Sequence, residues 1–257
     1  MKVNTAVANA GSVDLAREAA KKGSAMTPTP ISRTATRNAG LALIVAAILF
    51  FLGEAITAAA WPHGSYSYMG DVISDLGATS RAKTNDGKWI HSPAGWVINA
   101  AWVINGALTF TAAIVLRRHP RASRLSRWVF GLAVAYGFGL CVVAIFHNAP
   151  TWMLPYHTVG AMIGMGGGNA ALILVGLLLR AEKAPSVTSR FFIVAGIIGF
   201  ISLLLTFAAP EGYIGLIERC AAYSVLIAQI VGGANICRNA KQLSARHSVR
   251  STAPALG

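Results

Sequence analysis

Charged residues are scarce in this sequence, and acidic residues are the scarcest of them. Of the 257 residues, 12% are charged and 9 are Asp or Glu, whereas 54% are hydrophobic. The mean hydropathy of +0.55 lies well above that of soluble globular domains. These proportions exclude an ordinary soluble domain and indicate an all-α integral membrane protein.

The sequence also lacks a cysteine pattern and a basic, polar domain. Its three cysteines, Cys141, Cys220 and Cys237, lie in or at the end of apolar segments, so they indicate neither a disulfide framework nor a cysteine metal site. The net charge is +13, but the basic residues lie between apolar segments and not among aromatic residues of a soluble domain. We therefore predict membrane lipids, and no nucleic acid, as partners.

Six apolar segments are each close to the roughly 20 residues needed to cross the hydrocarbon core. They cover residues 39–60, 94–116, 128–147, 157–179, 191–209 and 214–236. We predict a transmembrane domain of six helices over 39–236, a disordered basic tail over 1–38 and a second tail over 237–257. In the fourth segment, Gly160, Gly164 and Gly168 recur every four residues and predict a close helix contact.

Lysine and arginine are concentrated in the two tails and in the second and fourth loops. The opposite loops carry Arg81, Lys83 and Lys88, with Arg219 just inside the last segment. Positive residues flank the cytoplasmic ends of membrane helices. We therefore predict a multi-pass protein of the plasma membrane with both termini in the cytoplasm.

The first outer loop is the longest and contains the stretch Tyr66–Gly77. Apolar side chains recur there at helical spacing, at Met69, Val72, Ile73 and Leu76. The other side of this predicted helix carries Asp71, Ser74 and Asp75. We predict a short amphipathic helix with Ser67 as its N-cap. Its carboxylates either face water or form one wall of a polar site.

Ionisable and polar residues inside the spans are informative because a bilayer makes them costly. Glu54 lies about 9 Å below the outer interface at 1.5 Å per residue. Glu218 and Arg219 lie about one turn inside the sixth span, and we expect Arg219 to pair with Glu54 or with an aspartate of the first loop. Asn99 and Asn105 are predicted to hydrogen-bond between helices.

Two histidines flank the short hairpin between the third and fourth spans. His147 and Asn148 close the third span, and His157 opens the fourth. The hairpin places both histidines at the same depth, where they can converge with Asp71 and Asp75. A set of His147, His157 and Asp75 suits zinc or another divalent metal as cofactor.

Three short motifs resemble a known family. Ile-Ser-Asp-Leu-Gly at Ile73–Gly77, the pair His147-Asn148 and Gly-Leu-Ile-Glu-Arg at Gly215–Arg219 resemble the multi-span bacterial and archaeal membrane family known as domain of unknown function 998. The similarity extends from about Leu41 to Ile236. It implies the six-span architecture and adds weight to these motif residues as a group, but the family has no settled activity.

The residue types are also loosely similar to those of the alkaline-ceramidase-like membrane hydrolases, in which a Ser, an Asp and three His surround zinc near one membrane face. Ser74, Asp75, His147 and His157 have matching types. The chain differs in having six spans where those hydrolases have seven. This resemblance implies hydrolysis of a lipid ester or amide.

The sequence supports three functional hypotheses. In the first, a lipid headgroup or small polar ligand binds the outer polar residues Glu54, Asp71, Ser74, Asp75, His147, Asn148, His157, Glu218 and Arg219. In the second, a metal activates water to hydrolyse a lipid ester or amide, and the catalytic candidates are Ser74, Asp75, Glu218 and Arg219. In the third, Glu54, Glu218 and Arg219 form an ion- or proton-coupled transport path.

Overall fold

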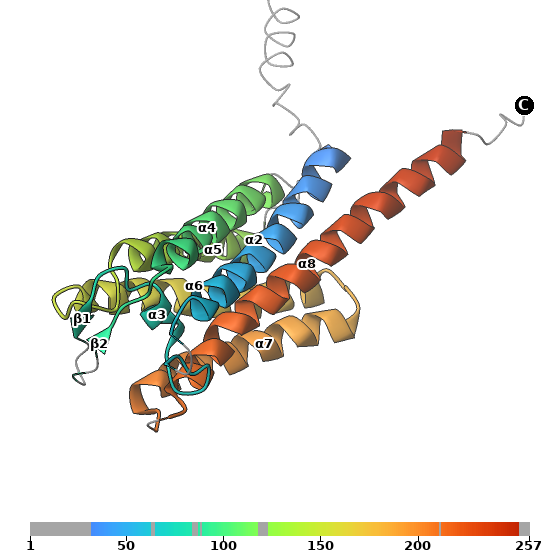
Figure 1. Cartoon of the computed structure of the whole chain (residues 1–257). Coiled ribbons are helices and arrows are strands. Elements are labelled where there is room, and N and C mark those ends of the chain that lie inside the picture. Colours follow the sequence, from blue (N-terminus) through green and yellow to red (C-terminus); the bar gives the residue numbers. More distant parts are fainter. Residues whose placement is uncertain are drawn as a thin grey trace, which may run out of the picture.

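Six long helices dominate the fold (Figure 1), which was obtained as a computed structural model. The structure describes residues 32–62, 65–83, 87, 89–117, 123–210 and 212–251, with the backbone alone described for 242–251. The long helices are α2 (Arg33–Ala59), α4 (Gly95–Arg117), α5 (Arg124–Ile145), α6 (Leu154–Ala181), α7 (Ser186–Leu205) and α8 (Ile214–Ser251). Each is long and apolar enough to cross a membrane, so the six predicted spans are confirmed.

The six helices form a closed ring. Each packs against the next one along the chain, and α8 packs against α2, which closes the ring. α6 also contacts α8 across it. Between α5 and α6 the approach is so close that a side chain on Gly139 would collide with the backbone at Gly160 and Gly164. The predicted close glycine contact is thus made between these two helices.

The first and last long helices extend beyond the predicted domain boundaries. α2 begins at Arg33 and not at 39, because Ser32 caps it by accepting a hydrogen bond from the Ala35 amide at 3.1 Å. α8 continues past 236 to Ser251. The start of α2 and the end of α8 lie at the same end of the ring (Figure 1), here named the terminal end. The remaining tail residues, 1–31 and 252–257, lie outside the described residues.

The opposite end, named the α3 end, carries the first loop. This loop contains the single helical turn α3 (Ile73–Leu76) and a two-stranded antiparallel ribbon of β1 (Ala82–Lys83) and β2 (Trp89–Ile90). The expected amphipathic helix is therefore reduced to one turn. The segment 67–71 before it forms a turn and is not part of the helix. In this turn the Ser67 amide donates to Asp71 Oδ2 and the Asp71 amide donates to the Ser67 carbonyl, each at 2.7 Å.

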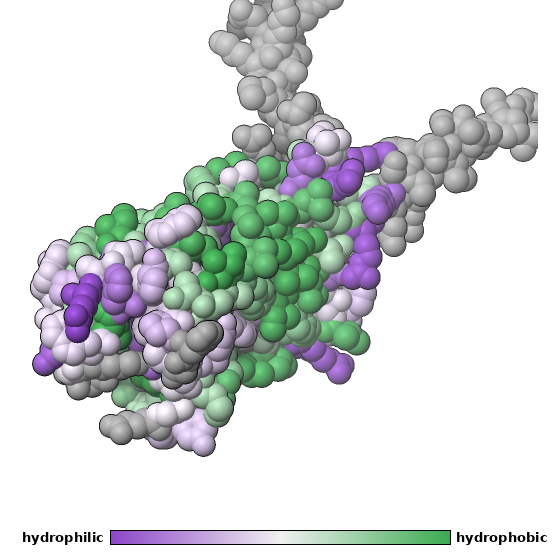
Figure 2. Space-filling view, in the orientation of Figure 1, coloured by the Kyte–Doolittle hydropathy of each residue, from purple (hydrophilic) through white to green (hydrophobic). Residues whose placement is uncertain are grey.

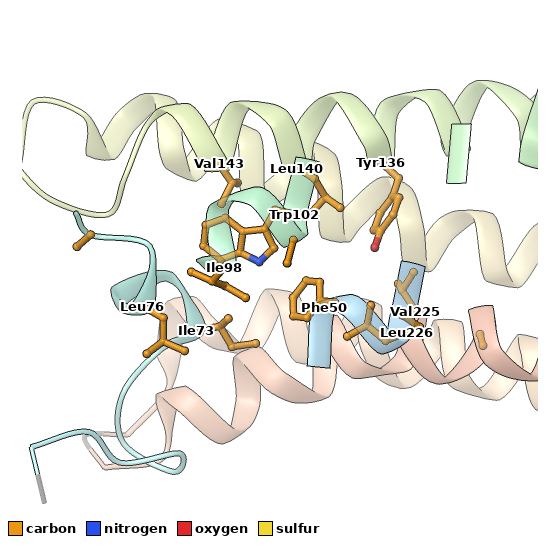
Figure 3. Packing of buried hydrophobic residues seen from close by; sticks show 14 of the residues in the cluster. Phe50, Ile73, Leu76, Ile98, Trp102, Tyr136, Leu140, Val143, Val225 and Leu226 are labelled. Carbon is orange, nitrogen blue, oxygen red and sulfur yellow. The ribbon is translucent and has the colours of Figure 1, made fainter. Parts of the chain in front are cut away.

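The α3 turn is buried in the mouth of the ring. Figure 3 shows Ile73 and Leu76 beside Ile98 and Trp102 of α4, with Phe50 of α2 near them. Because Ile73 and Leu76 are buried in this cluster, the polar residues between them in sequence are carried into the protein as well. Burial of these apolar groups therefore positions Ser74 and Asp75.

The outer surface of the ring is apolar around its middle. Figure 2 shows a hydrophobic band over the long helices, with hydrophilic residues gathered toward the two ends. Exposed apolar side chains on this surface include Leu52, Ile56, Val194 and Ile201. An apolar surface of this extent is what a bilayer requires of a spanning helical protein.

Candidate functional site

A cavity of about 440 Å³ lies at the α3 end, between the first loop, α6, the end of α7 and the start of α8. We name it the polar cavity. Its polar lining residues are Asp71, Ser74, Asp75, Asn148, His157, Thr158, Thr206 and Glu218. Its apolar lining residues include Met162, Met165, Leu203, Phe207 and Ile214. The polar cavity therefore has a hydrogen-bonding wall and an apolar wall.

Glu218 of α8 connects the sixth span to the α3 turn. Ser74 Oγ donates to Glu218 Oε1 at 2.7 Å, and the Ile73 amide donates to Glu218 Oε2. The N-cap residue Val72 has no side chain that can satisfy the first amides of the turn. The carboxyl group of Glu218 takes over this capping role from a helix far away in sequence.

Asp75 connects the same turn to the hairpin between α5 and α6. Asn148 Nδ2 donates to Asp75 Oδ1 at 2.7 Å, and the Asp75 residue is 5% exposed. Because a buried carboxyl group is costly without partners, this contact holds the hairpin against the loop. The turn is thus bound from two sides of the ring.

His157 lies in the first part of α6 and is 4% exposed. Its Nδ1 lies 2.8 Å from the carbonyl oxygen of Phe146. A carbonyl can only accept, so Nδ1 carries the proton and Nε2 is left as a hydrogen-bond acceptor. No hydrogen bond to Nε2 is found within the described part of the chain. His157 lines the polar cavity, and its Nε2 can accept a hydrogen bond.

Beside the polar cavity, a second group of side chains surrounds Arg219. We name it the Arg219 cluster; its members are Glu54, Tyr66, Tyr68, Arg219 and Tyr223. Arg219 Nε donates to Glu54 Oε1 at 2.9 Å, and Tyr223 Oη donates to Glu54 Oε2 at 2.8 Å. The side chains of Arg219 and Glu54 are 4% and 2% exposed. The expected pairing of Arg219 with Glu54 is confirmed.

The same arginine fastens the first loop to the ring. Its Nη1 donates to the carbonyl oxygens of Tyr68 at 2.7 Å and Asp71 at 2.8 Å, and its Nη2 donates to Tyr66 Oη. The guanidinium lies over the Tyr68 ring, 4.6 Å from its centroid. These contacts engage the side chain fully, so Arg219 positions the loop.

The two loop tyrosines stay protonated. Burial raises the pKa of Tyr66, and burial together with the nearby Glu54 carboxyl group raises the pKa of Tyr68. A protonated Tyr66 can both accept from Arg219 and donate to the Val72 carbonyl oxygen at 3.1 Å. These two hydrogen bonds require Tyr66 to be protonated, which agrees with its raised pKa.

His147 does not join the polar cavity. Its Nε2 lies 3.1 Å from Asn99 Nδ2, and its Nδ1 lies 3.4 Å from Thr79 Oγ1. Burial lowers the pKa of His147, so the neutral form is favoured at neutral pH. Both histidines were expected to lie beside Asp71 and Asp75. Only His157 lines the polar cavity together with them.

The metal set expected from the sequence is not assembled. Across the described ranges, no three His, Cys, Asp or Glu side chains are grouped so that they could hold a metal ion. His147 lies against Asn99 and is absent from the lining of the polar cavity, to which His157 and Asp75 belong. This arrangement of His147, His157 and Asp75 does not fit zinc.

A family model matches most of the chain. The model described as protein of unknown function (DUF998) matches residues 44–235. The chain belongs to this family. The DUF998 match contains every residue of the polar cavity and of the Arg219 cluster. Comparison with curated proteins and with solved structures yields no match.

Sequence reasoning missed several residues of the site in this DUF998 chain. Tyr66 and Tyr223 of the Arg219 cluster were not candidates, and neither were Thr158 and Thr206 of the polar cavity. A tyrosine four residues after Arg219 was the available signal, because residues four apart share a helix face. The threonines carried no signal, since a hydroxyl in an apolar helix usually bonds its own backbone.

Proposed function

We propose that the polar cavity binds a lipid headgroup or a small polar ligand. The observation that carries this proposal is the cavity itself, of about 440 Å³, which lies within the size range of small-molecule sites. One wall offers fixed hydrogen-bonding groups and the other is apolar. An amphiphile from the membrane would place its polar group on the first wall and its chain on the second.

The charge of the lining defines the ligand class. The described lining residues include three carboxyl groups, on Asp71, Asp75 and Glu218, and neither lysine nor arginine. Asn148 donates one amide hydrogen to Asp75, and Ser74 donates its hydroxyl hydrogen to Glu218. A lining rich in carboxyl oxygens favours a ligand that supplies donors, as an ammonium or polyhydroxyl group does, over a phosphate group.

The position of the basic residues supports an outward-facing cavity. Arg117, Arg124, Arg127, Arg180 and Lys183 lie at the terminal-end tips of their helices or in the adjoining turns. Under the positive-inside rule this end is cytoplasmic. In the plasma membrane the polar cavity would then open toward the cell exterior.

Thermal unfolding in mild detergent tests the proposal, because a ligand that binds the folded state raises the Tm. The probes are ethanolamine, choline, inositol and inorganic phosphate. We expect an amine or the polyol to raise the Tm and phosphate to leave it unchanged. Asn148→Ala should remove the shift, whereas Thr111→Ala, at an exposed position in the terminal half of α4, should keep it. A shift with phosphate alone, or an equal shift in Asn148→Ala, contradicts the proposal.

Hydrolysis of a lipid ester or amide is a second candidate, and one contact favours it. The 2.7 Å bond between Ser74 Oγ and Glu218 Oε1 is the arrangement of a hydroxyl nucleophile with an adjacent base. If this candidate is correct, the protein releases p-nitrophenol from a p-nitrophenyl ester and Ser74→Ala abolishes the release. Thr111→Ala, which removes a hydroxyl bonded to the Ala107 carbonyl of its own helix at 2.8 Å and lies outside the polar cavity, should retain it.

A further inference from the structure

A second cavity lies inside the helix ring, in the half toward the terminal end. Its volume is about 390 Å³, and all six long helices contribute lining residues. It extends along α4 from Thr109 to Arg117 and along α6 from Gly168 to Glu182, the residue that follows the helix. At 1.5 Å per residue these stretches are about 12 Å and 21 Å long. We name this elongated space the terminal cavity; it has no lining residue in common with the polar cavity.

The walls of the terminal cavity are mostly apolar. They include Ala112, Leu116, Val129, Leu172, Val175 and Phe192. A cavity lined by such side chains does not hold ordered water but takes up apolar ligands. In a membrane, the acyl chains of the surrounding lipids are the nearest apolar ligands.

The inner end of the terminal cavity is closed by a polar network that satisfies itself. Tyr136 Oη donates to Asn105 Oδ1 at 2.8 Å, and Asn105 Nδ2 donates to Gln229 Oε1 at 3.0 Å. Gln229 Nε2 in turn donates to Thr109 Oγ1 at 2.9 Å. Because most of their donors are used on one another, these groups offer little to a polar end of an occupant. The part of the occupant that reaches them should be apolar.

The mouth of the terminal cavity is lined by polar residues, and most of the charged residues around it are basic. Arg117, Ser126 and Glu182 line it, and Arg117 and Glu182 are exposed. The Arg117 guanidinium lies 4.6 Å from the centroid of the Phe130 ring, which holds it at the mouth. Nearby helix ends add Arg124, Arg127, Arg180 and Lys183. A basic rim at a membrane surface attracts anionic lipid headgroups.

We propose that the terminal cavity holds one acyl chain of an anionic phospholipid, with the phosphate of its headgroup at Arg117. The chain enters from the membrane surface at the terminal end and stops at the network around Tyr136. This site is separate from the polar cavity and does not depend on the function proposed for it.

Native mass spectrometry of the protein in mild detergent tests this site. The protein is incubated with phosphatidylglycerol or phosphatidylcholine and then activated until loosely bound lipid is lost. We expect one phosphatidylglycerol to be retained per protein, and less phosphatidylcholine. Ala113→Phe combined with Ala171→Phe fills the cavity from two walls and should abolish retention. Ala170→Phe, a neighbour outside the lining, is the matched control and should retain the lipid.

Two further variants separate the parts of the proposal. Arg117→Gln should keep one bound lipid but lose the preference for phosphatidylglycerol. Val129→Phe fills the cavity from α5 and replaces the double variant if that variant does not fold, as judged by thermal unfolding. The proposal is overturned if the wild type retains no lipid, or if a folded cavity-filling variant retains as much lipid as Ala170→Phe does.

Discussion

The two halves of the ring are stabilised by different means. At the α3 end, charged and polar side chains from α2, the first loop and α8 are bonded to one another, as Arg219 is to Glu54 and Glu218 is to Ser74. In the terminal half the helices surround an apolar cavity, and the polar side chains of its network are neutral. This difference is the reason why we propose a polar ligand at one end and an acyl chain at the other.

This difference also bears on the transport hypothesis. Its residues Glu54, Glu218 and Arg219 all lie at the α3 end. At the inner end of the terminal cavity, the described network consists of Asn105, Thr109, Tyr136 and Gln229. Because this network carries no charged group, it adds no support for a charged path through the ring.

The largest effect is expected from breaking the ion pair at the α3 end. Arg219→Met leaves Glu54 buried without its cation and releases the first loop. We expect the free energy of unfolding to fall by about 3 to 5 kcal/mol, measured by chemical unfolding in detergent micelles. A loss below about 1 kcal/mol would mean that the pair behaves as a surface pair and that the α3 end is not held by charge.

Two controls sharpen this prediction. Glu54→Gln combined with Arg219→Met removes both charges and should be more stable than Arg219→Met alone, because no unpaired charge remains. Arg238→Met removes an exposed arginine farther along the same helix, where the side chain bonds to Asn235 Oδ1 at 2.8 Å. We expect it to change the free energy of unfolding by no more than about 0.5 kcal/mol.

A smaller effect is expected from the neutral network in the middle of the ring. Gln229→Leu removes the partner of Asn105 and Thr109 and should destabilise the protein by about 0.6 kcal/mol, and by at most about 1.7 kcal/mol, the average and the largest value for hydrogen bonds between membrane helices. Ser224→Ala is the matched control on α8, because this hydroxyl bonds the carbonyl of its own helix at Cys220. Equal losses in the two variants would contradict an interhelical role for the network.

The smallest effect on the free energy of unfolding is expected from protonation of His147. Its pKa is lowered by burial from the ordinary value of 6.5, so the unfolded chain binds the proton more readily than the folded protein does. The free energy of unfolding should therefore be fully retained above pH 6.5 and should decline as the pH falls through the lowered pKa. In His147→Gln the decline, followed by chemical unfolding at several pH values, should be shallower. Identical slopes for both proteins would show that His147 titrates alike in the two states.

Sequence reasoning identified the members of the polar cavity better than their partners. Ser74 and Asp75 were candidates because they lie on the polar side of an amphipathic stretch, and His157 and Glu218 because polar groups in or beside a span are costly. Their convergence could not be read from spacing, since Ser74 and Glu218 are 144 residues apart in sequence. His147 was misplaced for the same reason. Equal depth in the membrane constrains the height of a side chain but not its direction around the helix axis.

The sequence by itself determined the number of spans. It also determined that Glu54, Glu218 and Arg219 lie near one end of the spans and that most of the remaining basic residues gather at the other. Both depend on local hydropathy, because each span must be apolar along its own length. The tertiary structure decided that α3 is one buried turn, that Glu218 caps it and that Arg219 holds the loop. These features depend on closure of the ring by α8 against α2, which brings the sixth span beside the first loop, and no local pattern encodes that contact.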